Sequence, residues 1–403
     1  MIENKSISFL TKEECTGCRL CGDCCSKHSI SFKEDEEGFS YPNVDEKTCI
    51  NCGLCAKVCP ALHTQKCERG EKSYAVYANE SVKRESGSSG GFFGAIGEMV
   101  LDNGGRVWGA AFDGELKLVH QKADNRQELV PLLKSKYIQS NLKGVYAQIK
   151  KDIREGVNTL FCGSPCQVNA LKNFIGRNSE CLITVDFVCH GVPNQLLFDR
   201  SIRWYEEKHG VKVDWFQFRY KGDDVKHPQA FALRHKGEKN VRKGLHYQFP
   251  YYFGFQKYMT LRPSCYQCKW ACAERAGDIT LGDYWGIEKY IPELNAKDGI
   301  SMILCNTAKG QVLFDTLESE GKITVHDLPL NNAVESNGCL QGPSPIKKER
   351  EEFFKHLQEW DFDKVVKGHL TPKKKWIFDI YYGIPKPIRN FVRKVMDKRM
   401  KYE

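Results

Sequence analysis

Cysteine is the residue type in this chain with the clearest capacity for chemistry. The sequence has 403 residues, and 19 of them are cysteine. Its amino terminus is polar and lacks the apolar core of a signal peptide, and no apolar run approaches the length of a membrane span. We therefore expect a cytoplasmic protein. Disulfides are rare in that compartment, so ligation of metal ions or metal clusters is the better account of the cysteines.

The cysteines near the amino terminus fall into two matched runs. One run is Cys49-x2-Cys52-x2-Cys55-x3-Cys59-Pro60, and the other is Cys15-x2-Cys18-x2-Cys21, followed by Cys24 and Cys25. In bacterial-type ferredoxins, three thiolates of such a run hold one [4Fe–4S] cluster and the fourth ligates the other cluster. The spacing predicts a ferredoxin-type module with two [4Fe–4S] clusters in residues 1–70.

This crossed pattern predicts the ligands of each cluster. Cys15, Cys18, Cys21 and Cys59 would hold one, and Cys49, Cys52, Cys55 and Cys25 the other. Cys25 keeps the three-residue step, but Ser26 stands where the second run has proline, so Cys24 remains an alternative. Zinc is the competing interpretation, although zinc sites rarely use three cysteines at this spacing twice. Such a module carries single electrons, so its partner chemistry must lie in the remaining residues.

Alternating strand-like and helix-like segments must position that chemistry. Residues 107–112, 159–162 and 182–188 are apolar and strand-like, whereas 143–155 and 165–174 have helical patterns. Strands separated by helices indicate an α/β layer. We expect domains at residues 1–70, 71–210 and 211–345, the last with shorter strand-like runs, and a helical basic tail at 346–403.

Three motifs lie at predicted element ends. Ser88-Ser89-Gly90-Gly91 precedes a helix-like run, Gly163-Ser164-Pro165-Cys166-Gln167 follows a strand, and Cys189-His190-Gly191-Val192-Pro193 ends another. A helix start with free N–H groups can bind phosphate, although a Gly/Ser sequence is commonly only a turn. The positions of Cys166 and Cys189 are those where α/β sheets place their sites.

A further cysteine pair, Cys265-x2-Cys268, precedes Arg275 and the run Gly277-Asp278-Ile279-Thr280-Leu281-Gly282-Asp283-Tyr284-Trp285-Gly286. With Cys166 and Cys189 this pair supplies four thiolates, the number that a third [4Fe–4S] cluster needs. Two buried thiols plus a cysteine pair in a zinc site fit the spacing almost equally well.

The order and wording of these motifs resemble the coenzyme F-420 hydrogenase/dehydrogenase beta-subunit family. The resemblance covers roughly residues 10–290, and the ordered set is more specific than any one motif. It comprises the ferredoxin repeat, 35–42 (DEEGFSYP), 88–91 (SSGG), 136–140 (KYIQS), 163–167 (GSPCQ), 189–193 (CHGVP) and 265–286.

Members of that family hold FAD beside an iron–sulfur cluster, so the resemblance implies both groups here. The FAD would lie near Ser88, Ser89, Gly90, Gly91, Lys136, Tyr137, Gln139, Ser140 and Arg275. The third cluster would be held by Cys166, Cys189, Cys265 and Cys268, and Cys272 could replace one of these. Without the resemblance, Lys136 and Arg275 could equally be surface charges.

The resemblance implies an oxidoreductase with an N-terminal ferredoxin module, a mixed α/β flavin-binding domain and a helical basic tail. A flavin exchanges hydride and releases single electrons, which clusters accept one at a time. We expect a soluble electron carrier, ferredoxin or reduced deazaflavin, or a partner redox subunit. The alternative is a non-catalytic relay subunit. The substrate and the catalytic residues stay unassigned.

Positive charge is concentrated at the carboxyl end. The net charge is +9, and residues 372–403 contain ten Lys/Arg and three Asp/Glu. Because the rest is nearly balanced, we expect no nucleic-acid partner. Ile388, Phe391, Val392, Val395 and Met396 follow a helical spacing. We favour packing of this face on the chain's own body over contact with an anionic membrane surface.

Overall fold

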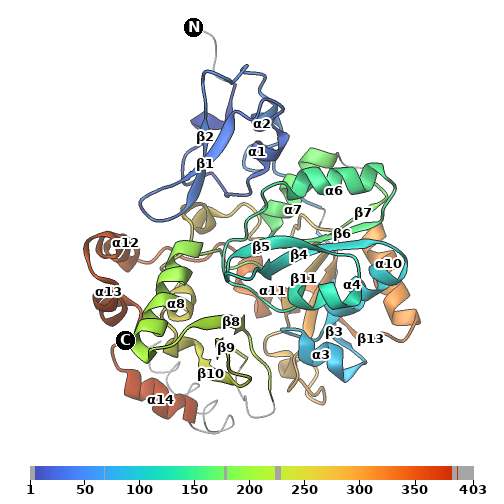
Figure 1. The fold of residues 1–403 in the computed structure, drawn as a ribbon. Coiled ribbons are helices and arrows are strands. Elements are labelled where there is room, and N and C mark those ends of the chain that lie inside the picture. The colour runs from blue at the N-terminus through green and yellow to red at the C-terminus, as the bar shows by residue number, and fades with distance from the viewer. Residues whose placement is uncertain (1–4, 68, 177–178, 223–227, 384–387, 389–403) are drawn as a thin grey trace.

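The computed structural model describes residues 5–67, 69–176, 179–222, 228–383 and 388 (Figure 1). The first part is a small module, drawn in blue. Its elements are η1 (Ile7–Phe9), α1 (Leu20–Cys24), β1 (Ile30–Glu34), β2 (Ser40–Val44) and α2 (Leu54–Lys57). Strands β1 and β2 pair antiparallel, with Ile30 opposite Val44.

The two cysteine runs of this module adopt the same backbone conformation. Both neighbours of Cys18 have positive φ, 67° and 68°, and so do both neighbours of Cys52, 53° and 73°. One neighbour in each run is a glycine, the residue that adopts this conformation without steric cost. Each run then enters a short helix, α1 or α2. The repeat seen in the spacing is therefore also a repeat of the fold.

Within the described residues, eight strands form the main sheet, in the order β13-β3-β12-β11-β7-β6-β4-β5. The strands β4, β6, β7 and β11 run parallel, and the others are antiparallel to their neighbours. Their bounds are β3 (Lys72–Ala78), β4 (Arg106–Phe112), β5 (Leu118–Ala123), β6 (Thr159–Cys162), β7 (Leu182–Phe187), β11 (Ile279–Asp283), β12 (Ser301–Cys305) and β13 (Ile323–Pro329).

Helices cover both faces of this sheet. They are α3 (Ser81–Ser86), α4 (Phe92–Asp102), α5 (Arg126–Leu129), α6 (Val145–Arg154), α7 (Pro165–Ile175), α10 (Ala308–Ser319) and α11 (Leu330–Ser336), with short helices η2 (Val130–Leu132), η5 (Ile287–Lys289) and η6 (Gly338–Leu340). Because successive strand residues point to opposite faces, Leu160 packs with α4 and α10 whereas Phe161 packs with α6 and α7.

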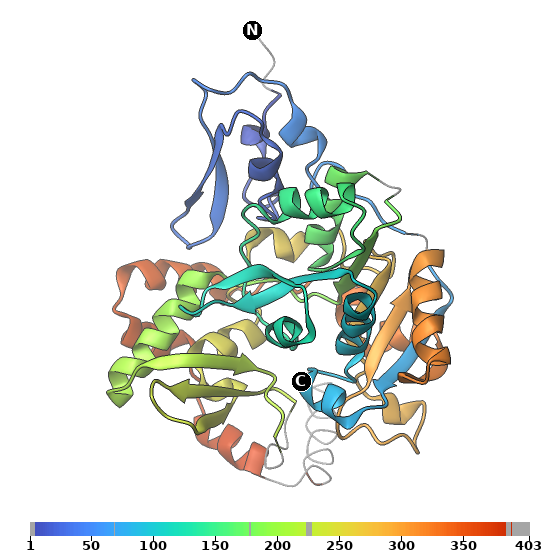
Figure 2. The same cartoon turned by 45° about the vertical axis from the view of Figure 1, so that its right-hand side comes forward.

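The module joins the body on the α6 and α7 face, as both views show (Figures 1 and 2). Leu20 and Val58 of the module share one apolar core with Tyr146 of α6 and Leu171 of α7. The carboxylate of Asp23 also accepts hydrogen bonds from the backbone N–H groups of Gly144 and Tyr146, at 2.9 and 3.1 Å. These contacts satisfy N–H groups at the start of α6 that have no partner within the helix.

A second sheet, three-stranded in the described part of the chain, lies beside the main one. It contains β8 (Val213–Phe218), β9 (Ala230–His235) and β10 (Val241–Leu245). Helices and short helices around it are α8 (Gln195–His209), η3 (His246–Gln248), α9 (Pro250–Gln256), η4 (Pro263–Gln267), α12 (Glu349–Glu359), α13 (Phe362–His369) and α14 (Lys375–Gly383). Its core is aromatic, with Phe198, Phe216 and Phe249 in mutual ring contact.

The predicted strands at 107–112, 159–162 and 182–188 are confirmed as β4, β6 and β7, and the predicted helices as α6 and α7. The mixed α/β class with an N-terminal ferredoxin-type module is confirmed as well. The boundary expected at residue 210 separates β7 from β11 along the chain, yet these two strands are hydrogen-bonded neighbours. Residues 211–278 are thus part of an insertion between two neighbouring strands of the main sheet.

The carboxyl region is helical as far as the structure describes it. In α14, Phe378 and Tyr382 pack against Tyr247, whereas Trp376 is 63% exposed. Of the predicted apolar stripe, Ile388 is exposed. Its other members, Phe391, Val392, Val395 and Met396, lie outside the described residues. Among the described helices, none combines the length and apolarity needed to cross a membrane.

Candidate cluster and cofactor sites

The structure brings Cys59 of the second run beside the first run. Burial raises the pKa of the Cys18 thiol well above its ordinary value, and the charge of Cys59 raises it further. Burial likewise raises the pKa of Cys21, and the neighbouring charges of Cys18, Cys15 and Cys59 add to the effect. Like charges act this way only at close range. Cys59 therefore lies close to thiols of the first run, and Cys55 of its own run also acts on it. The crossed assignment of ligands stays a prediction.

Cys24 lies between the two runs, near Cys21 of the first run and Cys55 of the second. Burial raises the pKa of Cys24 to about 12, with further contributions from the charges of Cys55 and Cys25. The Cys24 thiol donates to the carbonyl of Cys21 at 3.4 Å. Cys25 caps the carboxyl end of α1 and is less buried. Cys52 is exposed.

Four cysteines from separate parts of the body line one cavity of about 190 Å³. Cys166 lies in the first turn of α7, Cys189 follows β7, and Cys265 and Cys268 lie in and just after η4. Burial raises the pKa of Cys189 well above its ordinary value, and the charges of the other three cysteines raise it further. These four thiols therefore form a common site.

Local structure holds Cys166 and Cys189 in place. Ser164 and Gln167 form a capping box at the start of α7, and the Ser164 hydroxyl lies 3.2 Å from the Cys166 sulfur. Gly191 has a φ of +101°, and its N–H donates to the Cys189 sulfur at 3.4 Å. A Cβ atom at Gly191 would lie 2.9 Å from the Cβ of Cys265. Only glycine satisfies both the conformation and this close approach.

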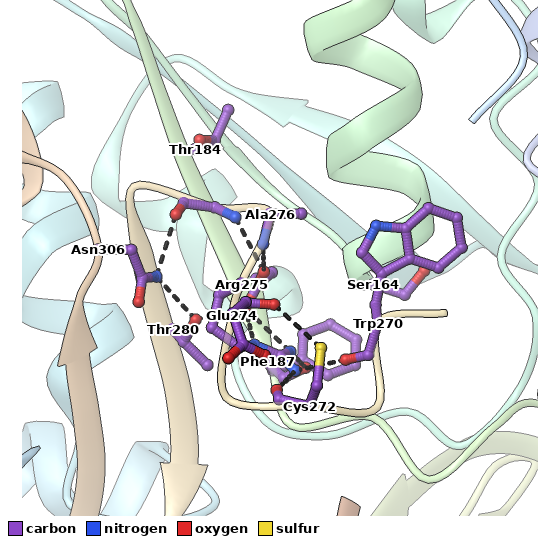
Figure 3. A network of polar contacts seen from close by, with 12 residues as sticks. Ser164, Thr184, Phe187, Trp270, Cys272, Glu274, Arg275, Ala276, Thr280 and Asn306 are labelled. Atoms are coloured by element: carbon purple, nitrogen blue, oxygen red, sulfur yellow. Dashed lines mark hydrogen bonds and ion pairs between the residues drawn. The ribbon is translucent and has the colours of Figure 1, made fainter. Parts of the chain in front are cut away.

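Arg275 forms hydrogen bonds both to the loop that contains Cys268 and to the end of β7 (Figure 3). Its guanidinium is 1% exposed and pairs with the buried carboxylate of Asp186 at 3.2 Å. It also donates to the carbonyls of Trp270, Phe187 and Cys272, at 2.7, 3.0 and 3.1 Å. Each nitrogen of the guanidinium thus donates to a protein acceptor, so Arg275 supports the cysteine loop.

Two other cysteines near this loop bond to backbone carbonyls. The Cys272 thiol donates to the Glu274 carbonyl at 3.2 Å, and the Cys67 thiol donates to the Gly277 carbonyl at 3.7 Å. Neither lines the cavity of the other four cysteines. The structure therefore groups Cys268, and not Cys272, with that set.

The body cysteines adjoin the ferredoxin-type module. Glu13, Thr16 and Ala61 of the module line the same cavity, and the charge of Cys166 is among those that raise the pKa of Cys18, after burial and Cys59. Tyr146 lies beside this junction, where its buried hydroxyl donates to the Cys18 carbonyl at 3.1 Å. The module and the body thus place two sets of thiols next to each other.

Residues 88–91 form a loop that leads into the start of α4 and makes polar contacts with several elements. The Ser88 hydroxyl accepts from the N–H of Ser135 at 2.7 Å, and the Gly90 N–H donates to the Ser301 hydroxyl at 3.0 Å. A Cβ atom at Gly90 would collide with the Val76 carbonyl. Gly91 precedes α4 with a φ of +88°. The fold alone therefore explains why glycine occupies these two positions, whether or not a ligand binds there.

Several cations surround this loop. Arg219 is buried, holds Asp283 through two bonds of 2.8 and 2.9 Å, and donates to the Ser88 carbonyl. Lys221 donates to the Ser89 carbonyl at 2.7 Å. Burial lowers the pKa of Lys136 to about 7 and those of Lys134 and Lys221 to about 8. The charge of Lys134 lowers the pKa of Lys136 further, and the charges of Arg219 and Lys134 lower that of Lys221. Such a group of desolvated cations favours an anionic ligand.

Buried donors without a protein partner lie in the same region. Among the residues that the structure describes, these include the Nε of Arg219 and the Nε and Nη2 of Arg84. The Arg84 carbonyl accepts from Lys221, which also donates to the Ser89 carbonyl, and the Arg84 guanidinium lies 4.4 Å from the centre of the Tyr77 ring. A buried donor without a partner carries a desolvation penalty that an anionic ligand would relieve.

Residues 136–140 connect this cation group to the cysteine cavity. Lys136 donates to the carbonyls of Pro131 and Leu133 on one side. Tyr137 stacks on Phe255 at 4.5 Å, and its hydroxyl accepts from Arg219 at 3.4 Å. Ser140 accepts from Gln167 at 3.1 Å, and Gln139 lines the cysteine cavity. The predicted cofactor residues are therefore divided between two neighbouring sites.

The sequence did not indicate Lys134, Arg219 or Lys221. Lys134 precedes the motif at 136–140 by two residues. Arg219 and Lys221 directly follow β8 of the second sheet. A basic pair at a strand end was the available signal, but nothing in the sequence places that strand end against residues 88–91.

Comparisons with known proteins agree with this organisation. Residues 157–330 match the C-terminal part of the coenzyme F420 hydrogenase/dehydrogenase beta subunit, and residues 14–62 match the 4Fe-4S dicluster domain. The chain is 23% identical over 352 residues to the coenzyme F420-dependent sulfite reductase of Methanocaldococcus jannaschii. That match covers 81% of this chain and 50% of the relative, so the chain spans about half the relative's length.

A solved structure that also matches is a chain of the F420-reducing [NiFe] hydrogenase complex from Methanosarcina barkeri. Its TM-score is 0.44 at 15% identity, and the match covers 69% of this chain and 90% of that chain. The two family matches thus identify residues 14–62 as similar to 4Fe–4S dicluster domains, and residues 157–330 as similar to the C-terminal part of coenzyme F420 hydrogenase/dehydrogenase beta subunits.

Proposed function

We propose that this chain is an iron–sulfur flavoprotein oxidoreductase that converts between two-electron transfer at FAD and one-electron transfer at [4Fe–4S] clusters. The observation that carries the proposal is the convergence of Cys166, Cys189, Cys265 and Cys268 around one cavity next to Cys18 of the dicluster domain. Four thiolates suffice for a cubane cluster, and this one would adjoin the first cluster of the module.

We assign the ligands of the two module clusters as the cysteine spacing predicts. Cys15, Cys18, Cys21 and Cys59 would hold the cluster nearer the body, and Cys49, Cys52, Cys55 and Cys25 the outer one. Under this assignment, electrons would pass between the body cavity and the outer cluster through the cluster held by Cys18, and Cys52, a proposed ligand of the outer cluster, is exposed. Ile50 and Leu54, which are 61% and 40% exposed, flank Cys52 in the sequence. An external carrier or a partner redox subunit would exchange electrons there.

The cation group supports binding of FAD near residues 88–91. The pyrophosphate of FAD is anionic, and Lys134, Lys136, Arg219 and Lys221 offer the opposite charge there, together with the unpaired donors of Arg84. When bound, a flavin supplies hydride exchange coupled to release of single electrons. Ser88–Gly91, Lys136 and Tyr137 belong to this proposed site. Gln139 and Ser140 border the cysteine cavity, and we assign Arg275 to the support of its loop.

The electron donor is proposed to be a reduced deazaflavin or a ferredoxin. The sulfite reductase relative is named for its dependence on coenzyme F420, and the present chain matches half of that relative. This match supports a deazaflavin as the two-electron partner. The acceptor substrate of the relative is not carried over to this chain.

Anaerobic purification with iron, sulfide and flavin analysis tests the proposal. We expect about twelve iron atoms per chain, four for each cubane, and released FAD. Replacing Cys189 by Ala should remove about four iron atoms and leave the two module clusters. The matched control is Cys305→Ala, because Cys305 is half-buried like Cys189 but lies outside the cavity. Full iron in the Cys189 variant would contradict the third cluster, and clusters without any flavin would leave a relay subunit.

A further inference from the structure

Three side chains with metal-ligating atoms converge in the C-terminal helices. The His356 Nδ1 lies 2.8 Å from the His369 Nε2, and the Glu352 Oε1 lies 3.9 Å from the same His356 nitrogen. The ligand atoms of all three residues lie within 4.8 Å of one another. This cluster, here called the α12–α13 triad, lies outside both matched regions, 14–62 and 157–330.

The two helices α12 and α13 together provide the three candidate ligands. Glu352 and His356 are one turn apart on α12, so they share a face, and His369 is the last residue of α13. The His356 ring stacks on Trp360 at 3.5 Å, and the His369 ring meets Phe353 edge to face at 5.8 Å. Both imidazoles are thus held by aromatic contacts, whereas the Glu352 side chain is 62% exposed and open to solvent.

We propose that Glu352, His356 and His369 form a binding site for a divalent ion of the zinc type. Two imidazole nitrogens and one carboxylate oxygen are ligands that zinc accepts, with water in the fourth position. Ligands of a tetrahedral ion at about 2.0–2.1 Å are about 3.3 Å apart. The two imidazole nitrogens, now 2.8 Å apart, therefore need to separate by only about half an ångström.

The carboxylate of Glu352 would balance part of the charge of a divalent cation bound at the triad. Two neutral imidazoles and one carboxylate leave a net charge of +1 when they hold a divalent ion. The Lys364 ammonium lies 4.0 Å from the centre of the Trp360 ring, on which His356 stacks.

A metal at this place would tie α13 to α12. The inner faces of the two helices, with Phe353, Leu357, Val365 and Val366, belong to the aromatic core of the second sheet. Both helices lie beside α8 (Figure 1). The ion would therefore act as a crosslink of the C-terminal region, independent of the proposed clusters.

The test uses the anaerobically purified chain with its iron–sulfur clusters intact. After equilibrium dialysis against zinc, elemental analysis should find about one zinc per chain and unchanged iron. Zinc K-edge X-ray absorption should show only nitrogen and oxygen neighbours at about 2.0–2.2 Å, without the sulfur shell at about 2.3 Å that cysteine ligands would give. Thus zinc at the triad is distinguished from zinc at the cysteines.

Glu352→Gln is the first variant, because its exposed side chain can change without disturbing the core, and we expect zinc affinity to fall at least tenfold. His369→Gln should remove the bound zinc. The control is His209→Gln, which replaces an exposed histidine at the end of α8. This variant should keep the bound zinc. Sulfur in the zinc shell, no bound zinc in the parent chain, or full zinc affinity in Glu352→Gln would each overturn the proposal.

Discussion

Arg262 carries a positive charge from the body of the protein into the dicluster domain. Its side chain is fully buried. The guanidinium donates to the Cys15 carbonyl at 2.7 Å, to the Ser40 carbonyl at 3.0 Å and to Gln139 at 2.9 Å, and Nη2 lies 3.7 Å from the Cys15 sulfur. A cluster gains negative charge on reduction, so this cation should stabilise the reduced form.

The size of the effect can be worked from this geometry. Adding a metal–sulfur bond of about 2.3 Å to the 3.7 Å contact places the charge about 6 Å from the nearest iron. With an effective dielectric constant of about 20, a unit charge at that distance contributes about 2.8 kcal/mol. For one electron this corresponds to about 120 mV. We therefore predict that Arg262→Gln lowers the reduction potential of the Cys15 cluster by roughly 100 mV.

The assay is an anaerobic redox titration followed by electron paramagnetic resonance, with iron analysis of every sample. Arg262→Lys keeps the charge and should recover much of the potential. Arg350→Gln is a second control, since Arg350 is also largely buried but pairs with Glu37 at 2.9 Å. An unchanged potential in Arg262→Gln with full iron content would refute the electrostatic reasoning. Loss of iron in that variant would instead show that Arg262 is needed to assemble the cluster.

Three further predictions concern the proposed ligands and cofactor site. Cys25→Ser should lower the iron content by about one cluster while Cys24→Ser keeps it; the opposite result in iron analysis would exchange the two roles. Lys136→Met should weaken flavin retention at least tenfold. In the parent chain, flavin affinity should fall as the pH rises above about 7, because Lys136 has a pKa of about 7 and loses its charge there; equilibrium binding at pH 6 and 8.5 checks this, and the variant should lack that part of the pH dependence. Gly191→Ala should cost about 1–3 kcal/mol through its positive φ, measured by chemical unfolding, and should also deplete the third cluster.

Local patterns in the sequence were sufficient to predict the ferredoxin-type module and several strands of the main sheet. The spacing of the cysteine runs records a repeat whose two halves share one backbone conformation. Cys166 and Cys189 follow predicted strands, and those strands, β6 and β7, are neighbours in the sheet. The convergence of these two cysteines could therefore be anticipated from the rule that parallel strands place their carboxyl ends together.

Contacts between distant segments could not be read from the sequence. Arg275 has its carboxylate partner, Asp186, 89 positions away, so the sequence shows only a cation near a cysteine pair. Arg219 and Lys221 reach residues 88–91 from a separate sheet. Their positions depend on how two sheets pack, a tertiary property without a periodic signal in either segment.

The apolar core that joins the module to α6 and α7 has a kinetic consequence. Leu20 and Val58 pack into the same core as Tyr146 and Leu171, and Asp23 binds the start of α6. Buried contact of this kind fixes the separation of Cys18 and Cys166. Under the proposed assignment, electrons would tunnel between two stationary centres, without the swing of a tethered carrier domain. The rate of that internal step should therefore be insensitive to solvent viscosity, and any viscosity dependence of turnover would arise from encounters with external partners.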